Sequence, residues 1–137
     1  MRVFLDSSAF AKRYIRETGT AEVLDWCDRA SELALSGVAL AEIVAAFCRL
    51  RRDGVLSPRD YDRLQANFLE DIRDVAVCDL TPPVMASAIR ALERSPLRGM
   101  DAIHIGSAVA IGADVFLSAD RKQHDAALAA GLESRLV

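Results

Sequence analysis

Short apolar segments alternate along this chain with longer segments of helical periodicity. The short segments are mostly unbroken apolar runs, not runs in which apolar and polar residues alternate. Strands of that kind are buried on both faces, which is typical of a parallel sheet between two layers of helices. We therefore predict an α/β fold with three layers, α/β/α, around a central parallel sheet of four or five strands. The predicted strands cover residues 2–5, 32–36, 74–80, 115–118 and 133–137.

The segments between these strands carry the residue types at which helices begin and end. Thr20, Thr81 and the pair Ser57 and Pro58 favour helix starts, whereas Gly54 favours a helix end. The predicted helices cover about residues 8–16, 20–30, 38–53, 58–73, 81–95, 100–111 and 120–130.

The length and composition favour one compact domain. A chain of 137 residues, 52% of them hydrophobic, has enough apolar material for a core. The sequence contains no internal repeat, low-complexity tract or linker, so we expect a single domain over residues 1–137. The net charge of −3 excludes a protein coated with basic surface. A nucleic acid partner would therefore have to bind at a local basic patch.

The cysteines and the N-terminus indicate a cytoplasmic protein. Cys27, Cys48 and Cys78 are an odd number of thiols without a C-x-x-C pair, which favours buried thiols in a reducing compartment. Charged residues interrupt the N-terminal segment, so it does not resemble a signal peptide. The long apolar run at 102–119 divides into helix, turn and strand, and we do not interpret it as a membrane span.

Four acidic residues stand in apolar surroundings or at strand ends. Asp6 directly follows the first predicted strand, and Asp120 follows the fourth. Glu42 is the one charged residue of the stretch "VALAEIVAAF", and Asp101 lies at the start of a predicted helix. Sites in open α/β sheets form outside the carboxyl ends of the strands, so these four acids can converge at one edge of the sheet.

Converging carboxylates require a counter-ion. Without one they repel each other and raise each other's pKa values. Mg²⁺ or Mn²⁺ suits such a site, because both ions prefer oxygen ligands. An ion of this kind generates hydroxide and stabilises the charge of an in-line attack on phosphate. The chain has no glycine-rich phosphate loop, which argues against nucleoside triphosphate chemistry.

Each acid also has a purely structural interpretation. Asp6 fits the cap of the first helix, and Asp120 fits the cap of the last. Asp101 fits an N-terminal helix charge that interacts with the helix dipole. Glu42 fits a polar stripe shared with arginines of the same helix.

Histidines and basic residues near the acids likewise have both a structural and a functional interpretation. His104 and His124 each lie one helical turn beyond an acid, and a structural histidine is the favoured interpretation for both. The basic residues fit solvated faces or guides for a phosphate backbone. They are Lys12, Arg13 and Arg16 near the first acid and Arg121 and Lys122 beside the last.

Together these segments resemble a known family. The stretches are "VFLDSSAF" at the start, "ALAEI" in the third helix and "LRGMDAIHIGSAVAIGADVFLSAD" late in the chain, followed by a short C-terminal strand. The combination resembles the PIN domain, and within that family it looks most like the toxin ribonucleases of bacterial VapBC toxin–antitoxin pairs. The resemblance implies a parallel sheet between helices and an endoribonuclease that depends on Mg²⁺ or Mn²⁺.

The resemblance also implies roles for individual residues and partners. The family's catalytic acids correspond to Asp6, Glu42, Asp101 and Asp120. Asp6 and Asp101 would bind the metal, with Glu42 and Asp120 acting directly or through water. The family's hydroxyl groups, which orient ligands or water, correspond to Ser7 or Ser8 and to Ser118. The implied partners are an RNA substrate, a small VapB-like antitoxin whose tail blocks the site, and a second copy of the chain in a homodimer.

Three other functions have weaker support. An aspartyl-phosphate hydrolase with Asp6 as nucleophile usually has a second acid two residues on, where this chain has Ser8. A receiver-type phospho-switch requires an N-terminal acidic pair that is missing here. A PIN-domain nuclease or RNA-binding module outside a toxin–antitoxin system is the remaining alternative, and metal titration separates an enzyme from a module that only binds.

Overall fold

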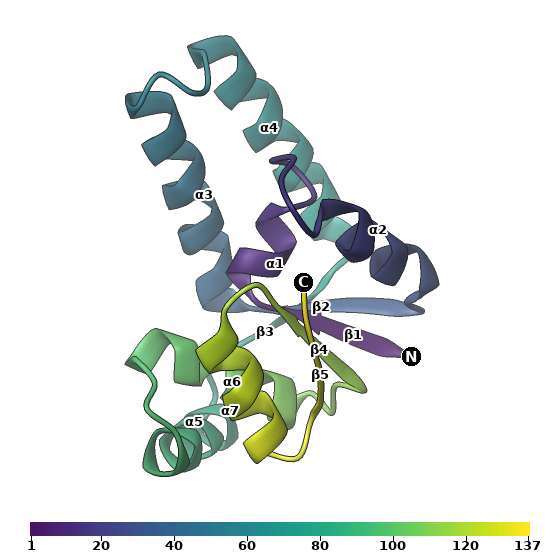
Figure 1. Cartoon of the computed structure of the whole chain (residues 1–137), viewed down its shortest axis with the longest axis vertical. Coiled ribbons are helices and arrows are strands. Elements are labelled where there is room, and N and C mark those ends of the chain that lie inside the picture. Colours follow the sequence, from purple (N-terminus) through teal and green to yellow (C-terminus); the bar gives the residue numbers. More distant parts are fainter.

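The computed structural model describes residues 1–137 and contains a five-stranded parallel sheet (Figure 1). The strand order is β3-β2-β1-β4-β5, and all four neighbouring pairs are parallel. This confirms the predicted fold class. The strands are β1 (Arg2–Leu5), β2 (Glu32–Ser36), β3 (Ala76–Cys78), β4 (Val115–Ser118) and β5 (Glu133–Leu136).

Seven α-helices and one short 3₁₀ helix connect the strands. Figure 1 shows α1 to α4 on one face of the sheet and α5 to α7 on the other. The helices are α1 (Ser7–Ala11), α2 (Thr20–Arg29), α3 (Gly37–Arg52), α4 (Pro58–Asp71), the 3₁₀ helix (Ile72–Asp74), α5 (Pro82–Arg94), α6 (Gly99–Ala110) and α7 (Arg121–Ala129). None of these helices combines the length and apolarity that crossing a membrane requires.

The two faces of the sheet bury separate hydrophobic cores. Successive side chains of a strand point to opposite faces, so Val3 and Leu5 enter one core whereas Phe4 enters the other. The first core, beneath α1 to α4, contains most of the large aromatic side chains. The second core, beneath α5 to α7, is rich in alanine, and Phe4 stacks there on Phe116 with ring centroids 5.7 Å apart.

Two predicted elements differ from the structure. The helix expected at 8–16 ends at Ala11, because the following residues form tight turns in which Lys12 N–H bonds to the Ala9 carbonyl. The strand expected at 74–80 contains only Ala76–Cys78, because the 3₁₀ helix occupies the chain up to Asp74. β3 is an edge strand that pairs with β2 alone.

The strand order fixes where a ligand site can form. β1 is central, with β2 on one side and β4 on the other, so the chain reverses its direction of winding between β1 and β4. Ligands in open α/β sheets bind outside the carboxyl ends of the strands at such a reversal. In this chain, Asp6 directly follows β1, and Ser118 is the last residue of β4.

Candidate active site

Asp6 is a fully buried carboxylate at the end of β1. Its Oδ1 accepts hydrogen bonds from Ser8 Oγ (2.7 Å) and Ala9 N–H (2.8 Å), and its Oδ2 accepts one from Ser118 Oγ. No Lys, Arg or His forms a salt bridge with it. Burial raises the pKa of Asp6, and the bonds from Ser118 and Ser8 lower it by less. The carboxylate is thus held in place while its charge lacks a paired cation.

Glu42 lies on α3 and faces the same region. Its Oε1 accepts hydrogen bonds from Ser7 Oγ (2.8 Å) and His104 Nε2 (2.6 Å). The hydrogen bond from His104, helped by the one from Ser7, lowers the pKa of Glu42 against the opposing effect of burial. About a third of the side chain, 34%, stays exposed. Arg49 lines the same cleft without pairing with Glu42, so the predicted arginine stripe does not hold this acid.

His104 was predicted as a structural histidine, and its contacts add a role at the site. The ring is 1% exposed. Its Nε2 bonds to Glu42 and lies 3.3 Å from Ser7 Oγ, while its Nδ1 is buried without a partner. Because a carboxylate only accepts hydrogen bonds, Nε2 carries the proton in this contact. His104 therefore holds one of the four predicted acids in position.

Asp120 and Asp101 both accept hydrogen bonds from Gln123, a residue that the sequence pattern did not mark as part of the site. Asp120 caps α7, with Oδ1 accepting from Lys122 N–H (2.7 Å) and Gln123 N–H (3.1 Å). Asp101 lies in the first turn of α6, and its Oδ1 accepts from Gln123 Nε2 (3.2 Å). The pattern Asp-x-x-Gln marks a helix start in the sequence. It does not reveal that the glutamine contacts an acid on another helix.

Most of the predicted site residues line two adjoining hollows, whereas Asp6 and Ser118 are fully buried and line neither. One cleft of about 390 Å³ includes Ser7, Ser8, Glu42, His104 and Gln123 among its lining residues. A second hollow of about 730 Å³ includes Asp101 and Asp120, together with Arg98, Arg121 and Lys122. Both are also lined by Ala119, which follows Ser118 directly.

The structure connects the predicted residues without clustering the acids. Hydrogen bonds join Asp6 to Ser8 and Ser118, Glu42 to Ser7, and Asp101 to the helix that Asp120 caps. No three side chains of His, Cys, Asp or Glu are grouped so as to hold a metal ion. The convergence of four acids on one ion therefore stays a prediction.

The chemistry of the available donors fits Mg²⁺ or Mn²⁺. The acids offer carboxylate oxygens, and no cysteine lines either hollow. Oδ2 of Asp6 accepts a single hydrogen bond, which leaves it a lone pair for a ligand. A buried carboxylate without a paired cation is costly, and a divalent ion would remove that cost.

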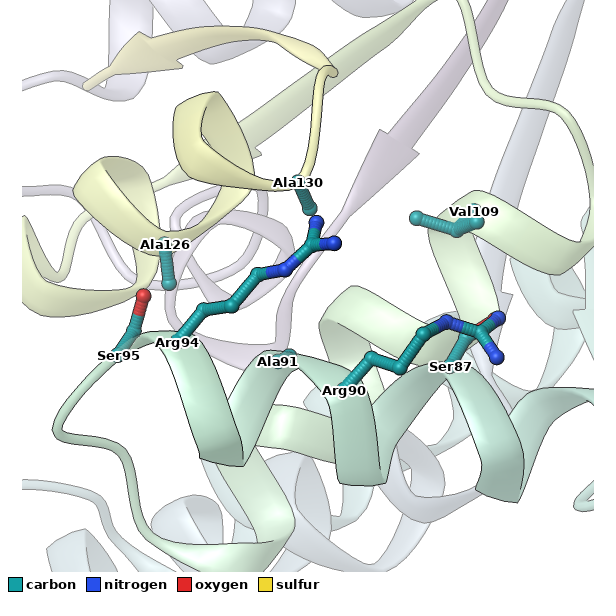
Figure 2. Close-up of a pocket in the computed structure, with 8 residues that line it drawn as sticks. All are labelled: Ser87, Arg90, Ala91, Arg94, Ser95, Val109, Ala126 and Ala130. Atoms are coloured by element: carbon teal, nitrogen blue, oxygen red, sulfur yellow. The ribbon is translucent and has the colours of Figure 1, made fainter.

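A third cavity lies away from these acids (Figure 2). It has a volume of about 50 Å³ and is lined by residues of α5, α6, α7 and their ends. Figure 2 shows Arg94 reaching toward Ala130 at the end of α7, and Arg90 donates a hydrogen bond to Ser87 Oγ (2.8 Å). Positive charge near helix C-termini is a stabilising arrangement, and no acid or histidine lines this cavity. We therefore assign it a structural role.

Comparisons with known proteins agree with this fold. The family model described as PIN domain matches residues 3–128. Ribonuclease VapC45 of Mycobacterium tuberculosis (strain CDC 1551 / Oshkosh) is 34% identical over an alignment that covers 94% of this chain and 91% of the relative.

Solved structures share the fold at low sequence identity. Mycobacterium tuberculosis VapC20, described as a sarcin-ricin loop cleaving toxin, matches with a TM-score of 0.66 and 19% identity, covering 90% of this chain and 94% of that one. A toxin–antitoxin complex from Klebsiella pneumoniae matches with a TM-score of 0.67 and 9% identity, covering 88% of each chain.

Proposed function

The chain belongs to the PIN domain family, and on that premise we propose that it is the toxin of a type II toxin–antitoxin system. In this proposal residues 1–137 form a single PIN-like domain that acts as a metal-dependent endoribonuclease and hydrolyses RNA phosphodiester bonds. The proposal rests on one observation. Asp6 is a fully buried carboxylate without a paired cation, and it lies where the winding of the parallel sheet reverses between β1 and β4. The relative named as a ribonuclease supports the choice of RNA as the substrate.

The predicted site residues fall into metal ligands and residues that hold those ligands in place. Asp6 and Asp101 would hold Mg²⁺ or Mn²⁺, with Glu42 and Asp120 contributing directly or through water. When bound, the ion lowers the pKa of water and neutralises charge on the attacked phosphate. Ser8 and Ser118 hold the Asp6 carboxylate by hydrogen bonds.

Glu42 is suited to orient the attacking water. Its lowered pKa keeps it ionised, and a third of its side chain is exposed to the cleft. Ser7 and His104 donate to the same oxygen, Oε1, which leaves Oε2 free to accept a hydrogen bond from water.

Basic side chains beside the acids are suited to the RNA backbone. Arg98, Arg121 and Lys122 line the second hollow with Asp101 and Asp120, and none of the three pairs with a carboxylate. Contacts to phosphates position a nucleic acid without reading its sequence. The hollow is a local positive feature on a chain whose net charge is −3.

Two of the other basic residues named in the sequence analysis are already engaged. Lys12 is buried, forms a salt bridge with Glu17 at 3.3 Å and donates to the Thr18 carbonyl. Arg13 pairs with Asp71 at 3.5 Å. We therefore assign the RNA backbone to the side of the site that carries Arg121, not to the side of α1.

The first cleft is suited to an antitoxin. Part of its wall is apolar, with Glu17 and Arg49 among the polar residues around it, and a VapB-like segment that covered this wall would block access to the acids. The apolar lining residues are Ala11, Ile15, Ile43, Ala46, Leu50 and Ala119. One structural neighbour is described as a toxin–antitoxin complex. The three free cysteines agree with a cytoplasmic location for the pair.

RNA cleavage with and without chelator tests this function. We expect cleavage by the isolated chain to be abolished in EDTA and restored by Mg²⁺ or Mn²⁺, and to be inhibited by the protein encoded next to it. Undiminished cleavage in EDTA would refute the metal-dependent mechanism. RNA binding without cleavage in Mg²⁺ would favour the alternative of a module that only binds RNA.

A further inference from the structure

Gln123 occupies an unusual place for a residue in the first turn of α7. It is 6% exposed, and its backbone N–H bonds to the capping carboxylate of Asp120. At this position a glutamine side chain commonly reaches back to the N–H of the capping residue. Here the Asp120 N–H donates to Ser118 Oγ (2.9 Å) instead. The Gln123 side chain is therefore free to contact another part of the molecule.

The side chain of Gln123 binds the carboxylate of Asp101 on α6. Its Nε2 lies 3.2 Å from Asp101 Oδ1, and only this end of the amide can face a carboxylate, because Oε1 would be repelled. Its Oε1 is buried and has no hydrogen-bond partner. Such an acceptor is uncommon in native proteins and costs free energy when it stays unpaired.

The same side chain links the two hollows of the site, because it lines one and binds a residue of the other. Gln123 lines the cleft that contains Glu42 and His104, whereas Asp101, which it binds, lines the other hollow. Gln123 thus lies at the boundary between Glu42 and Asp101, which belong to different helices.

We infer that Gln123 is a positioning residue that orients Asp101 for metal binding and accepts a hydrogen bond from a water molecule of the occupied site through Oε1. This inference rests on the proposed function in one respect, the assignment of Asp101 as a metal ligand. A neutral amide suits the task because it donates to the carboxylate without adding charge to a site already rich in acids. Residues that orient metal ligands in this way change metal affinity when they are replaced.

Gln123→Met separates this role from a structural one. Methionine is similar in length and helix propensity, and the cap of α7 survives because it uses the backbone N–H of residue 123. The matched control is Gln65→Met on α4, because Gln65 is the only other glutamine in the chain.

Calorimetric titration with Mn²⁺, without RNA, measures the effect. We expect Gln123→Met to weaken Mn²⁺ binding by about 10-fold while the melting temperature in EDTA stays at or above the wild-type value. Gln65→Met should bind Mn²⁺ as wild type does. Wild-type binding by Gln123→Met would refute the inference. A loss of Mn²⁺ affinity matched by a lower melting temperature in EDTA would also count against it, because it would indicate a structural role.

Side-chain amide signals in NMR spectra give a second readout that does not involve activity. The chain has three side-chain amides, those of Gln65, Asn67 and Gln123, so each signal is assigned by a single substitution. We expect the Gln123 signals to shift when Mg²⁺ is added and in Asp101→Asn, which itself adds a fourth pair, while the signals of Gln65 and Asn67 stay in place.

The outcomes distinguish the two claims. If the Gln123 signals shift neither with Mg²⁺ nor in Asp101→Asn, the role of Gln123 is refuted while the proposed function stays intact. Absence of any Mg²⁺ or Mn²⁺ binding by the wild-type chain would instead overturn the metal site on which the proposed function depends.

Discussion

At the residue scale, Asp6 combines full burial with a charge that no basic side chain pairs. Burial raises the pKa of Asp6 in the native state, so the native state binds its proton more tightly than the unfolded chain does. Stability from this group is therefore present below the unfolded-state pKa and is lost as pH rises through the native-state pKa.

We predict that Asp6→Asn raises the melting temperature of the metal-free protein at neutral pH and that this increase becomes smaller at acidic pH. Asparagine keeps the shape of the side chain and has no charge to desolvate. Melting curves in EDTA from neutral to acidic pH measure the difference between the variant and wild type, and Asp53→Asn, at an exposed position, controls for the change in net charge. A gain that does not depend on pH would contradict the explanation by burial.

Substitution of Asp101 tests whether this residue is a metal ligand or only a charge that interacts with the helix dipole. If Asp101 is a ligand, Asp101→Asn should leave the metal-free protein as stable as wild type or more stable by ~0.5–2 kcal/mol, since stabilising changes are common at functional sites. Oδ1 of asparagine still accepts the hydrogen bond from Gln123. RNA cleavage should fall by orders of magnitude, because charge stabilisation is lost.

The structural interpretation of Asp101 predicts the opposite result. A charge that serves only the dipole of α6 would cost about 0.3–1 kcal/mol when neutralised and leave cleavage nearly intact. Thermal melts in EDTA combined with a cleavage assay in Mg²⁺ therefore separate the two roles. A destabilised but active Asp101→Asn would remove this residue from the site.

At this scale the sequence singles out the four candidate acids, but not all of the residues that hold them in place. Asp6 and Asp120 stand out because each directly follows or nearly follows a strand, and the structure shows that both also cap helices. The sequence does not reveal the role of Gln123, because its partner Asp101 is 22 residues away on another helix. His104 was recognised as a buried histidine, whereas its contact with Glu42, 62 residues away, required the fold.

At the element scale, the close approach of α5 and α6 depends on one glycine. A Cβ at Gly106 would lie 2.5 Å from the Val84 carbonyl oxygen and 2.7 Å from the Ala88 nitrogen, both of which are backbone atoms. These distances are too short, so one helix would have to shift. Because α6 carries Asp101 and His104, this packing also positions the site.

We predict that Gly106→Ala destabilises the protein by about 1–3 kcal/mol, the usual range for overpacking. Gly99→Ala is the matched control on the same helix, because an added Cβ there has no neighbour within 4 Å. Urea denaturation of the two variants gives the comparison. Equal stabilities of Gly106→Ala and wild type would show that α5 and α6 can separate without cost.

The sequence predicts which segments are helices and strands more reliably than it predicts their first and last residues. The strands Arg2–Leu5, Glu32–Ser36 and Val115–Ser118 match the predicted limits because buried strands leave continuous apolar runs. The helix predicted at 8–16 is shorter because its C-terminal part forms tight turns, which periodicity does not distinguish from helix. Strand order, and hence the meeting of Asp6 with Ser118, came only from the structure.

At the scale of the whole molecule, we predict a homodimer. Eleven large apolar side chains are exposed, and three of them, Met85, Ile89 and Leu92, lie on α5. Scattered exposed apolar side chains are common, but a contiguous patch marks association, and these three recur at the spacing of one helix face. Light scattering at tens of micromolar should give the mass of two chains, and a strictly monomeric chain would contradict the prediction.

We propose that four acids from separate parts of the chain form one divalent metal site. A crystal structure with Mn²⁺, located by its anomalous scattering, provides the decisive test. We predict an ion at the carboxyl ends of β1 and β4 that contacts Asp6 and Asp101, with Glu42 and Asp120 bound directly or through water. An ion elsewhere, or any of Asp6, Glu42 and Asp101 more than about 10 Å from the other two with Mn²⁺ present, would contradict the claim.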